Sequence, residues 1–152
     1  PQRIVMVGGS YGGYLTLLTA GKRPGLLAGG IAVAAIADWT MMVEDAAETL
    51  RSYFQALLGG SPADRPDAYR DGSPLTYAEN VQCPLLIIQG RNDTRCPPRQ
   101  MEVYFERLQA LGKDVEIEWF DAGHGLLVQE QQIENFARML QFVHRVLARA
   151  SG

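Results

Sequence analysis

Three short segments of this sequence carry the side chains best suited to covalent chemistry. Ser10, Asp93 and His124 each lie in a glycine-containing stretch, and they occur in the order serine, aspartate, histidine. A serine hydroxyl is a weak nucleophile until a base removes its proton, and imidazole is the natural base near neutral pH. A carboxylate fixes the tautomer of that imidazole and stabilises its cation. We therefore predict that these residues act together in acyl transfer, in the chain order typical of α/β-hydrolases.

Residues 8–13, with the sequence GGSYGG, indicate how Ser10 would be presented. An apolar run precedes them and a helical pattern follows, so the serine occupies a sharp strand-to-helix turn in the pattern G-x-S-x-G. Gly8 and Gly12 fill the glycine positions, where we expect strand and helix to approach too closely for a Cβ. The turn aims the backbone N–H of Tyr11 at a developing negative charge, which makes it the candidate oxyanion-hole donor. The glycine spacing fits neither a phosphate-binding loop nor a dinucleotide fingerprint.

Four apolar runs separated by helical patterns predict a parallel α/β sheet of about four strands flanked by helices. The runs lie at residues 3–7, 30–34, 85–89 and 115–120. Strands covered on both faces read as continuous apolar runs, whereas the fourth run alternates and is expected near a sheet edge, with one wet side. Functional residues of such sheets gather at the carboxyl ends of the strands, so the loops carrying Ser10, Asp93 and His124 should meet there.

Residues 40–80 show no strand pattern and are predicted to lie over the sheet edge where ligands enter. A helix in two pieces is expected within residues 41–58. Trp39, Met42 and Phe54 are our candidates for an apolar substrate pocket, with Met41 and Tyr53 as further possibilities. The alternative is that these side chains simply pack the segment onto the sheet, and the sequence leaves both interpretations open.

The C-terminal segment predicts one long amphipathic helix that buries a single face against the sheet. The apolar residues expected on that face are Ile133, Phe136, Ala137, Leu140, Val143 and Leu147.

Two other residues compete for the roles of acid and base. Asp38 follows the second strand at the same sheet edge as Asp93, and we interpret it as a turn or capping residue. His144 lies on the last helix, away from any strand end, and is expected at the surface. Arg91 and Arg95 flank the acid; either could bind a substrate carboxylate, although ordinary solvation is the simpler interpretation.

Composition excludes several classes of function. The chain has 152 residues, 47% of them hydrophobic and 20% charged, with a net charge of −3. That charge gives no reason to expect nucleic acid or an anionic membrane as a partner, and no apolar run is long enough to span a bilayer. Cys83 and Cys96 flank one predicted strand, about 20 Å apart or more, so we expect two free thiols and a cytoplasmic location. Neither has metal-ligand spacing, and we expect no metal and no cofactor.

The three motifs together resemble the prolyl oligopeptidase family of serine peptidases. Residues 8–14 are similar to its nucleophile motif, residues 89–93 followed by Cys96, Pro97 and Gln100 to its aspartate loop, and residues 122–125 to its histidine loop. The resemblance covers nearly the whole chain. It implies the C-terminal half of an α/β-hydrolase catalytic domain, normally preceded by a β-propeller, and hydrolysis of short peptides.

The sequence departs from the family because the propeller and the first half of the hydrolase sheet do not precede Ser10. We therefore expect residues 1–152 to form a single, partial catalytic domain. The missing half normally donates the second oxyanion-hole group, so the chain alone should be a poor enzyme. The open edge of the first strand should be covered by the missing N-terminal part of a parent chain or by a homo-oligomer partner.

Two other functions remain open at this stage. The same triad serves any acyl transfer, so a carboxylesterase or thioesterase is the alternative within hydrolases. A non-catalytic assembly module is the alternative from a different class.

Overall fold

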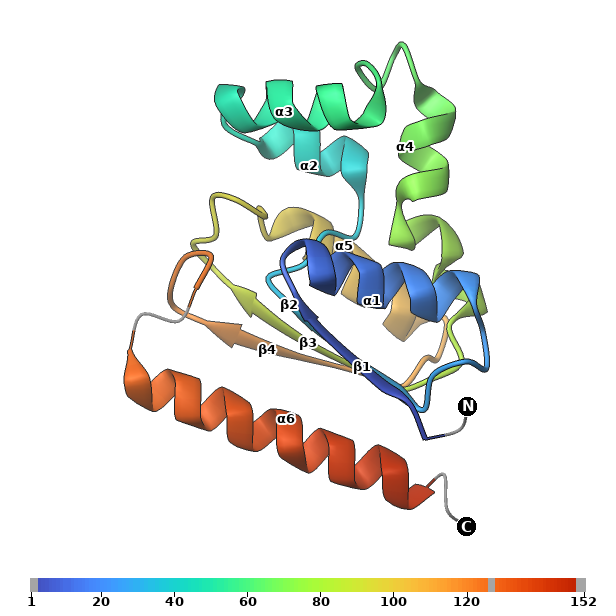
Figure 1. Ribbon diagram of the computed structural model, residues 1–152, viewed down its shortest axis with the longest axis vertical. Helices are drawn as coiled ribbons and strands as arrows, with labels where there is room; N and C mark the ends of the chain where they lie inside the picture. Colours follow the sequence, from blue (N-terminus) through green and yellow to red (C-terminus); the bar gives the residue numbers. More distant parts are fainter. Residues whose placement is uncertain (1–2, 126–127, 150–152) are drawn as a thin grey trace.

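A parallel four-stranded sheet forms the centre of the protein, as the computed structural model shows for residues 3–125 and 128–149 (Figure 1). The strands lie side by side in chain order and all neighbouring pairs are parallel, which confirms the predicted sheet. They are β1 (Val5–Gly9), β2 (Gly29–Val33), β3 (Leu85–Gly90) and β4 (Val115–Phe120).

Helices cover both faces of this sheet. On one face lie α1 (Tyr11–Lys22) and α5 (Arg99–Ala110), and on the other lies α6 (Gln129–Arg149) (Figure 1). Strand β3 shows why both faces need a cover: alternate side chains of a strand point to opposite faces, and β3 carries apolar side chains on both. Leu85 and Ile87 pack in the core cluster that contains residues of α1 and α5, whereas Leu86 and Ile88 pack in the cluster that contains residues of α6.

The polar side chains of β4 also face a helix. The alternating pattern predicted one wet side, and residues on that side form ion pairs with arginines of α6. The pairs join Glu116 to Arg145, Glu118 to Arg138, and Asp114, just before the strand, to Arg149.

Between β2 and β3 the chain forms a separate helical layer beyond α1 (Figure 1). It contains α2 (Trp39–Asp45), α3 (Glu48–Leu58) and α4 (Pro66–Gly72). The 3₁₀ helix that follows, η1 (Pro74–Asn80), packs against α1 and α5, with Ala78 in their core cluster. The predicted helix in two pieces is confirmed, and its break falls at residues 46–47, whose backbones are extended. Asp38 caps α2, since its Oδ1 accepts a hydrogen bond from the Met41 N–H at 2.8 Å. This confirms its interpretation as a capping residue.

The predicted buried face of α6 is wrong for its first half. Ile133, Phe136 and Leu140 are 61%, 64% and 60% exposed, whereas Phe142 and Val146 are buried against the sheet. The helix has apolar residues on two sides, and only one of them meets the sheet of this chain. Val143 and Leu147 lie against the buried cluster as expected.

Strand β1 is an edge strand in the described part of the chain, pairing only with β2. Ile4 and Val7 are 47% and 51% exposed, which matches the expected open edge and uncovered apolar surface. None of the described helices has the length and apolar character needed to cross a bilayer.

Candidate active site

Ser10 lies between the last residue of β1 and the first residue of α1. Its backbone is strained, with φ 53° and ψ −118°, a region that side-chain-bearing residues rarely adopt. Two backbone hydrogen bonds hold this conformation: the Ser10 N–H donates to the Val33 carbonyl at 2.8 Å, and its carbonyl accepts from the Tyr14 N–H at 3.0 Å. The structure therefore has the sharp turn that the G-x-S-x-G pattern predicts.

The glycines around Ser10 differ in what they permit. A Cβ on Gly8 would lie 2.2 Å from the Gly12 carbonyl oxygen, and one on Gly13 would lie 2.7 Å from the Ala35 Cβ. A Cβ on Gly12 would meet nothing within 4 Å among the described residues. Close approach therefore requires glycine at positions 8 and 13, and our expectation of a steric role for Gly12 is wrong.

Tyr11 begins α1, and the N–H of a first helical residue has no acceptor within its own helix. The Tyr11 N–H therefore lies at the positive end of the helix dipole, one residue after Ser10. The Tyr11 ring is 48% exposed and lies 5.1 Å from the Tyr14 ring and 6.3 Å from the Trp39 ring, measured between centroids.

Asp93 lies in the loop after β3 and is only 3% exposed. Its Oδ1 accepts backbone N–H hydrogen bonds from Arg95 at 2.9 Å and Cys96 at 2.8 Å. The Gln89 side-chain amide, at the end of β3, donates to its Oδ2 at 3.4 Å. The carboxylate is thus held by its own loop, whatever else approaches it.

The loop after β4 brings His124 to both partners. Its Nδ1 lies 2.9 Å from Asp93 Oδ2, and its Nε2 lies 3.0 Å from Ser10 Oγ. Hydrogen bonds join the two loops: the Asn92 N–H donates to the Ala122 carbonyl at 3.2 Å, and the Asn92 side chain donates to Asp121 at 2.8 Å. The structure therefore brings together the three residues that the sequence singled out.

Gly90 allows this approach, and sequence reasoning missed it. A Cβ at Gly90 would lie 2.4 Å from the Gly123 carbonyl oxygen and 2.5 Å from that of Ala122. The glycines beside His124 have more space: apart from its chain neighbours, a Cβ on Gly123 would come no closer than 3.7 Å to another described residue. The sequence places Gly90 at the end of a strand, but it does not show that the loop after β4 crosses there.

A pocket of about 280 Å³ opens beside Ser10 and His124. Its other lining residues are Tyr11, Ile36, Leu50, Tyr53, Phe54, Arg95 and Cys96. Leu50 and Phe54 lie one turn apart on α3, so both point the same way and roof the pocket. Arg95 lines the pocket, whereas Arg91 lies over the Trp119 ring.

Of the three leading candidates, only Phe54 lines the pocket; of the two further ones, Tyr53 lines it and Met41 is not among the described lining residues. Trp39 and Met42 are 1% and 0% exposed and lie beneath it, in a core cluster with Tyr14. Trp39 supports Phe54 from below, with ring centroids 5.5 Å apart. The pocket residues that sequence reasoning missed are Ile36, Leu50 and Cys96. Ile36 could have been found from its place just after β2, at the carboxyl edge of the sheet.

Cys96 is a buried thiol that lines the same pocket as Ser10. Burial raises its pKa to about 12, and the nearby Asp93 carboxylate acts in the same direction. The group is therefore a neutral thiol near pH 7 and forms part of the pocket wall. Cys83 is also free and buried.

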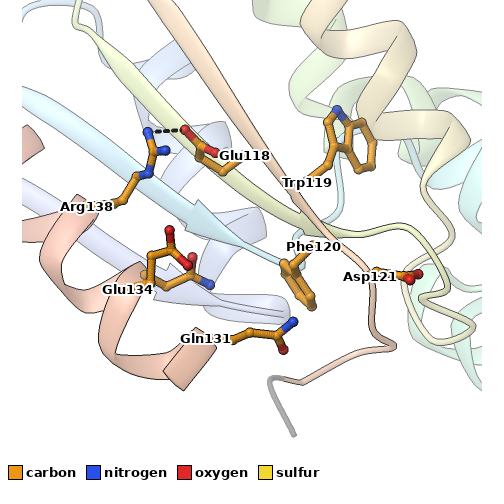
Figure 2. A pocket seen from close by; sticks show the side chains of 8 residues that line it. Glu118, Trp119, Phe120, Asp121, Gln131, Glu134 and Arg138 are labelled. Atoms are coloured by element: carbon orange, nitrogen blue, oxygen red, sulfur yellow. Dashed lines mark ion pairs between the residues drawn. The ribbon is translucent and has the colours of Figure 1, made fainter. Parts of the chain in front are cut away.

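A second pocket, of about 230 Å³, lies between β4 and the start of α6 (Figure 2). Figure 2 shows Glu118 paired with Arg138 on one side and Glu134 nearby. Among the described residues, its lining contains carboxylates but no histidine, serine or cysteine, so it lacks the serine–imidazole pair of the first pocket. Within the described residues, no three His, Cys, Asp or Glu side chains are placed to share a metal ion.

A family model described as the prolyl oligopeptidase family matches residues 1–150 of the chain. The chain belongs to this family. The prolyl oligopeptidase family consists of serine hydrolases that act as peptidases, and the sheet described above is part of an α/β-hydrolase fold.

Individual relatives agree with this membership. The chain is 32% identical over 127 residues to the uncharacterized peptidase YuxL of Bacillus subtilis, covering 83% of this chain and 19% of that protein. It is 31% identical over 129 residues to dipeptidyl aminopeptidase BIII of Pseudoxanthomonas mexicana, covering 82% of this chain and 19% of that protein. The chain thus spans about a fifth of the length of these relatives.

A solved structure has the same fold over nearly the whole chain. The acylaminoacyl peptidase of Pyrococcus horikoshii superposes with a TM-score of 0.85 at 31% identity, covering 96% of this chain and 24% of that one. A puromycin-hydrolyzing peptidase of Mycobacterium tuberculosis superposes with a TM-score of 0.89 at 28% identity, covering 97% of this chain and 22% of that one.

Proposed function

We propose that this chain carries the catalytic triad of a serine peptidase, with Ser10 as nucleophile, His124 as general base and Asp93 as the carboxylate that orients it. One observation carries the proposal: a single imidazole lies 3.0 Å from the Ser10 hydroxyl and 2.9 Å from the Asp93 carboxylate. Hydrogen-bond distances on both sides of the ring are what proton transfer from serine requires.

The proposed reaction follows from these positions. With its proton on Nδ1 and donated to Asp93, His124 accepts the Ser10 proton at Nε2 as Oγ attacks the substrate carbonyl carbon. The oxyanion that forms is stabilised by the Tyr11 N–H at the start of α1. His124 then gives its proton to the departing amine, leaving an acyl-enzyme on Ser10. Water, activated by the same imidazole, attacks this ester and releases the acid.

We propose short peptides as substrates. The names of relatives support this: dipeptidyl aminopeptidase, dipeptidyl peptidase 4 and acylaminoacyl peptidase all denote enzymes that remove short units from peptides. The pocket beside Ser10 is walled mainly by aliphatic and aromatic side chains, which suits an apolar residue on the acyl side of the cleaved bond.

The proposed site can be tested in the gene product that contains this sequence. A fluorophosphonate probe should label Ser10, and Ser10→Ala should abolish the labelling. Turnover of a peptide anilide and of a simple aryl ester should then be compared. Measurable anilide cleavage supports a peptidase. Labelling with ester cleavage alone would favour the carboxylesterase or thioesterase alternative, and no labelling would favour an assembly module.

We propose that the N-terminal part of a longer polypeptide covers the exposed apolar surfaces of β1 and α6, with a homo-oligomer as the alternative. The support is the unpaired β1 edge, the exposed Val7 and Phe136, and the small share of each relative that the chain spans. Light scattering of the 152-residue chain tests this. Self-association is expected, and a monodisperse monomer at micromolar concentration counts against it.

We also propose that the 152 residues alone turn over poorly, because the Tyr11 N–H is the one candidate oxyanion donor among their described residues. Loss of one such donor costs about a hundred- to a thousandfold in rate. Acyl-ester turnover by the isolated chain is the measurement, and a rate equal to that of a full-length relative would contradict the proposal. The two buried free thiols support a reducing compartment, the cytoplasm.

A further inference from the structure

A fully buried amide side chain ties the start of α5 to the segment after β2. Gln100 is 0% exposed, and its Oε1 accepts backbone N–H hydrogen bonds from Ala37 at 2.7 Å and Asp38 at 3.0 Å. Its Nε2 donates to the Ala35 carbonyl at 3.2 Å and lies 3.7 Å from the Met42 sulfur. These contacts span 58 to 65 positions of sequence, so they are part of the tertiary structure rather than of a local turn.

The segment that Gln100 holds forms a wall of the pocket. Its hydrogen bonds reach Ala35 on one side of Ile36 and Ala37 on the other, and Ile36 lines the pocket that contains Ser10. The segment begins at Ala34, whose φ of 46° is uncommon for a residue other than glycine. A strained conformation persists only where the surroundings fix it, and Gln100 supplies three of the hydrogen bonds that do so.

We propose that Gln100 is a positioning residue that sets the size preference of the pocket for the acyl-side residue of the substrate, acting through Ile36. This inference rests on the proposed function, and it adds a determinant of specificity that does not touch the substrate.

The hydrogen bonds of Gln100 predict that its loss changes the shape of the pocket and leaves the proposed catalytic triad intact. The side-chain hydrogen bonds described for Gln100 go to the segment after β2 and to the Met42 sulfur, and none goes to Ser10, Asp93 or His124. The Asp93 carboxylate is held by N–H groups of its own loop. Loss of Gln100 should therefore move the Ile36 wall while the hydrogen bonds of the imidazole persist.

Two substitutions remove the amide in graded steps. Gln100→Met keeps the length of the side chain but leaves the N–H groups of Ala37 and Asp38 buried without their acceptor, which the segment can relieve only by moving. Gln100→Glu keeps an acceptor for both N–H groups and places a carboxylate oxygen against the Ala35 carbonyl in place of a donor. The first change should displace Ile36 more than the second.

The experiment measures kcat/KM for two peptide anilides, one with phenylalanine and one with alanine on the acyl side, in the gene product that contains this sequence. Active sites are counted with a fluorophosphonate probe, so that unfolded protein does not enter the rates. Gln100→Met should reduce the ratio of the two kcat/KM values at least tenfold, chiefly through KM of the phenylalanine substrate. Gln100→Glu should reduce it less, and Ile36→Ala should reproduce the change directly.

Arg99→Gln is the matched control. Arg99 precedes Gln100 and also joins α5 to the layer above it, but through exposed ion pairs to Glu44 and Asp45. Exposed pairs contribute little, so the substrate ratio should stay within twofold of the wild-type value.

Several results would overturn the inference. An unchanged ratio in Gln100→Met or, should that variant not fold, in Gln100→Glu would do so, as would an equal fall of kcat for both substrates. Failure of the proposed function can be distinguished from failure of this inference, because the wild-type protein would then not be labelled by the fluorophosphonate probe. In that case the NMR signal of the Ile36 methyl group, assigned with Ile36→Val, still tests the positioning. It should shift in Gln100→Glu and not in Arg99→Gln, and the absence of a shift would refute the role of Gln100.

Discussion

Replacing Gly8 or Gly12 by alanine separates two glycines that the sequence pattern treats alike. In the structure a Cβ on Gly8 would lie 2.2 Å from the Gly12 carbonyl oxygen and 2.8 Å from the Gly13 nitrogen. A Cβ on Gly12 would have no neighbour within 4 Å among the described residues. We therefore expect Gly8→Ala to be damaging and Gly12→Ala to be tolerated.

The size of each effect follows from these distances. Side-chain carbons do not approach a carbonyl oxygen closer than about 3.0 Å, so Gly8→Ala forces the strand and α1 apart by about 0.8 Å. Backbone atoms cannot move aside as a flexible side chain does, so we expect a cost of about 3 kcal/mol, at the upper end for overpacking. Gly12→Ala removes a glycine from the first turn of α1 and should gain up to about 1 kcal/mol.

Thermal unfolding and active-site labelling measure both effects. At about 3 °C per kcal/mol for a chain of this size, Gly8→Ala should lower the Tm by about 10 °C, and Gly12→Ala should raise it by up to about 3 °C. Displacing Ser10 by most of an ångström from His124 should slow fluorophosphonate labelling about a hundredfold in Gly8→Ala, with little change in Gly12→Ala. Equal damage in both variants, or a Gly8→Ala protein as stable as the wild type, would refute the steric argument.

Further predictions concern the carboxylates and the thiols. Asp93→Asn should lower kcat by three to four orders of magnitude, because the imidazole loses its orienting carboxylate. Asp38→Asn should change kcat less than about threefold, since the asparagine side chain still caps α2. A larger fall of kcat in Asp38→Asn than in Asp93→Asn would show that Asp38, and not Asp93, is the triad carboxylate. Burial raises the pKa of Cys83 to about 11 and of Cys96 to about 12, both from an ordinary value of 9.0. The two buried thiols therefore contribute their full stabilisation below pH 9, and this contribution is lost as the pH rises toward 11 and 12. The urea concentration at the unfolding midpoint should fall between pH 8 and pH 10.5. It should fall less in a variant with alanine at both positions. For the same reason, native Cys96 should resist alkylation by iodoacetamide at pH 8 and react once the protein is unfolded, as mass spectrometry can measure.

The sheet and the three loops were predictable because each depends on local features of the sequence. Apolar runs of strand length, separated by helical patterns, specify a parallel sheet, and a parallel sheet places its functional loops at one edge. Ser10, Asp93 and His124 each follow such a run directly. Their meeting therefore follows from topology.

Contacts between distant segments were not predictable. The need for glycine at position 90 arises only when the loop after β4 crosses the end of β3, and no pattern near Gly90 records that crossing. Trp39 and Phe54 are both aromatic residues in the same helical layer, yet one lies beneath the pocket and the other in its wall. The buried side of α6 was predicted wrongly for a similar reason. Phe136 and Phe142 lie on different sides of the helix, and the sequence does not show which side packs against the sheet.

The base stands 114 residues after the serine it would activate, in the loop that follows the last strand of the sheet. During synthesis on the ribosome, β1 and its serine emerge long before β4 is made. Under the proposed mechanism, the Ser10 hydroxyl stays an ordinary alcohol until β4 docks beside β3, so the protein cannot cleave neighbouring nascent chains while it is itself incomplete. Ser10 would then become reactive only after translation and folding have brought His124 beside it.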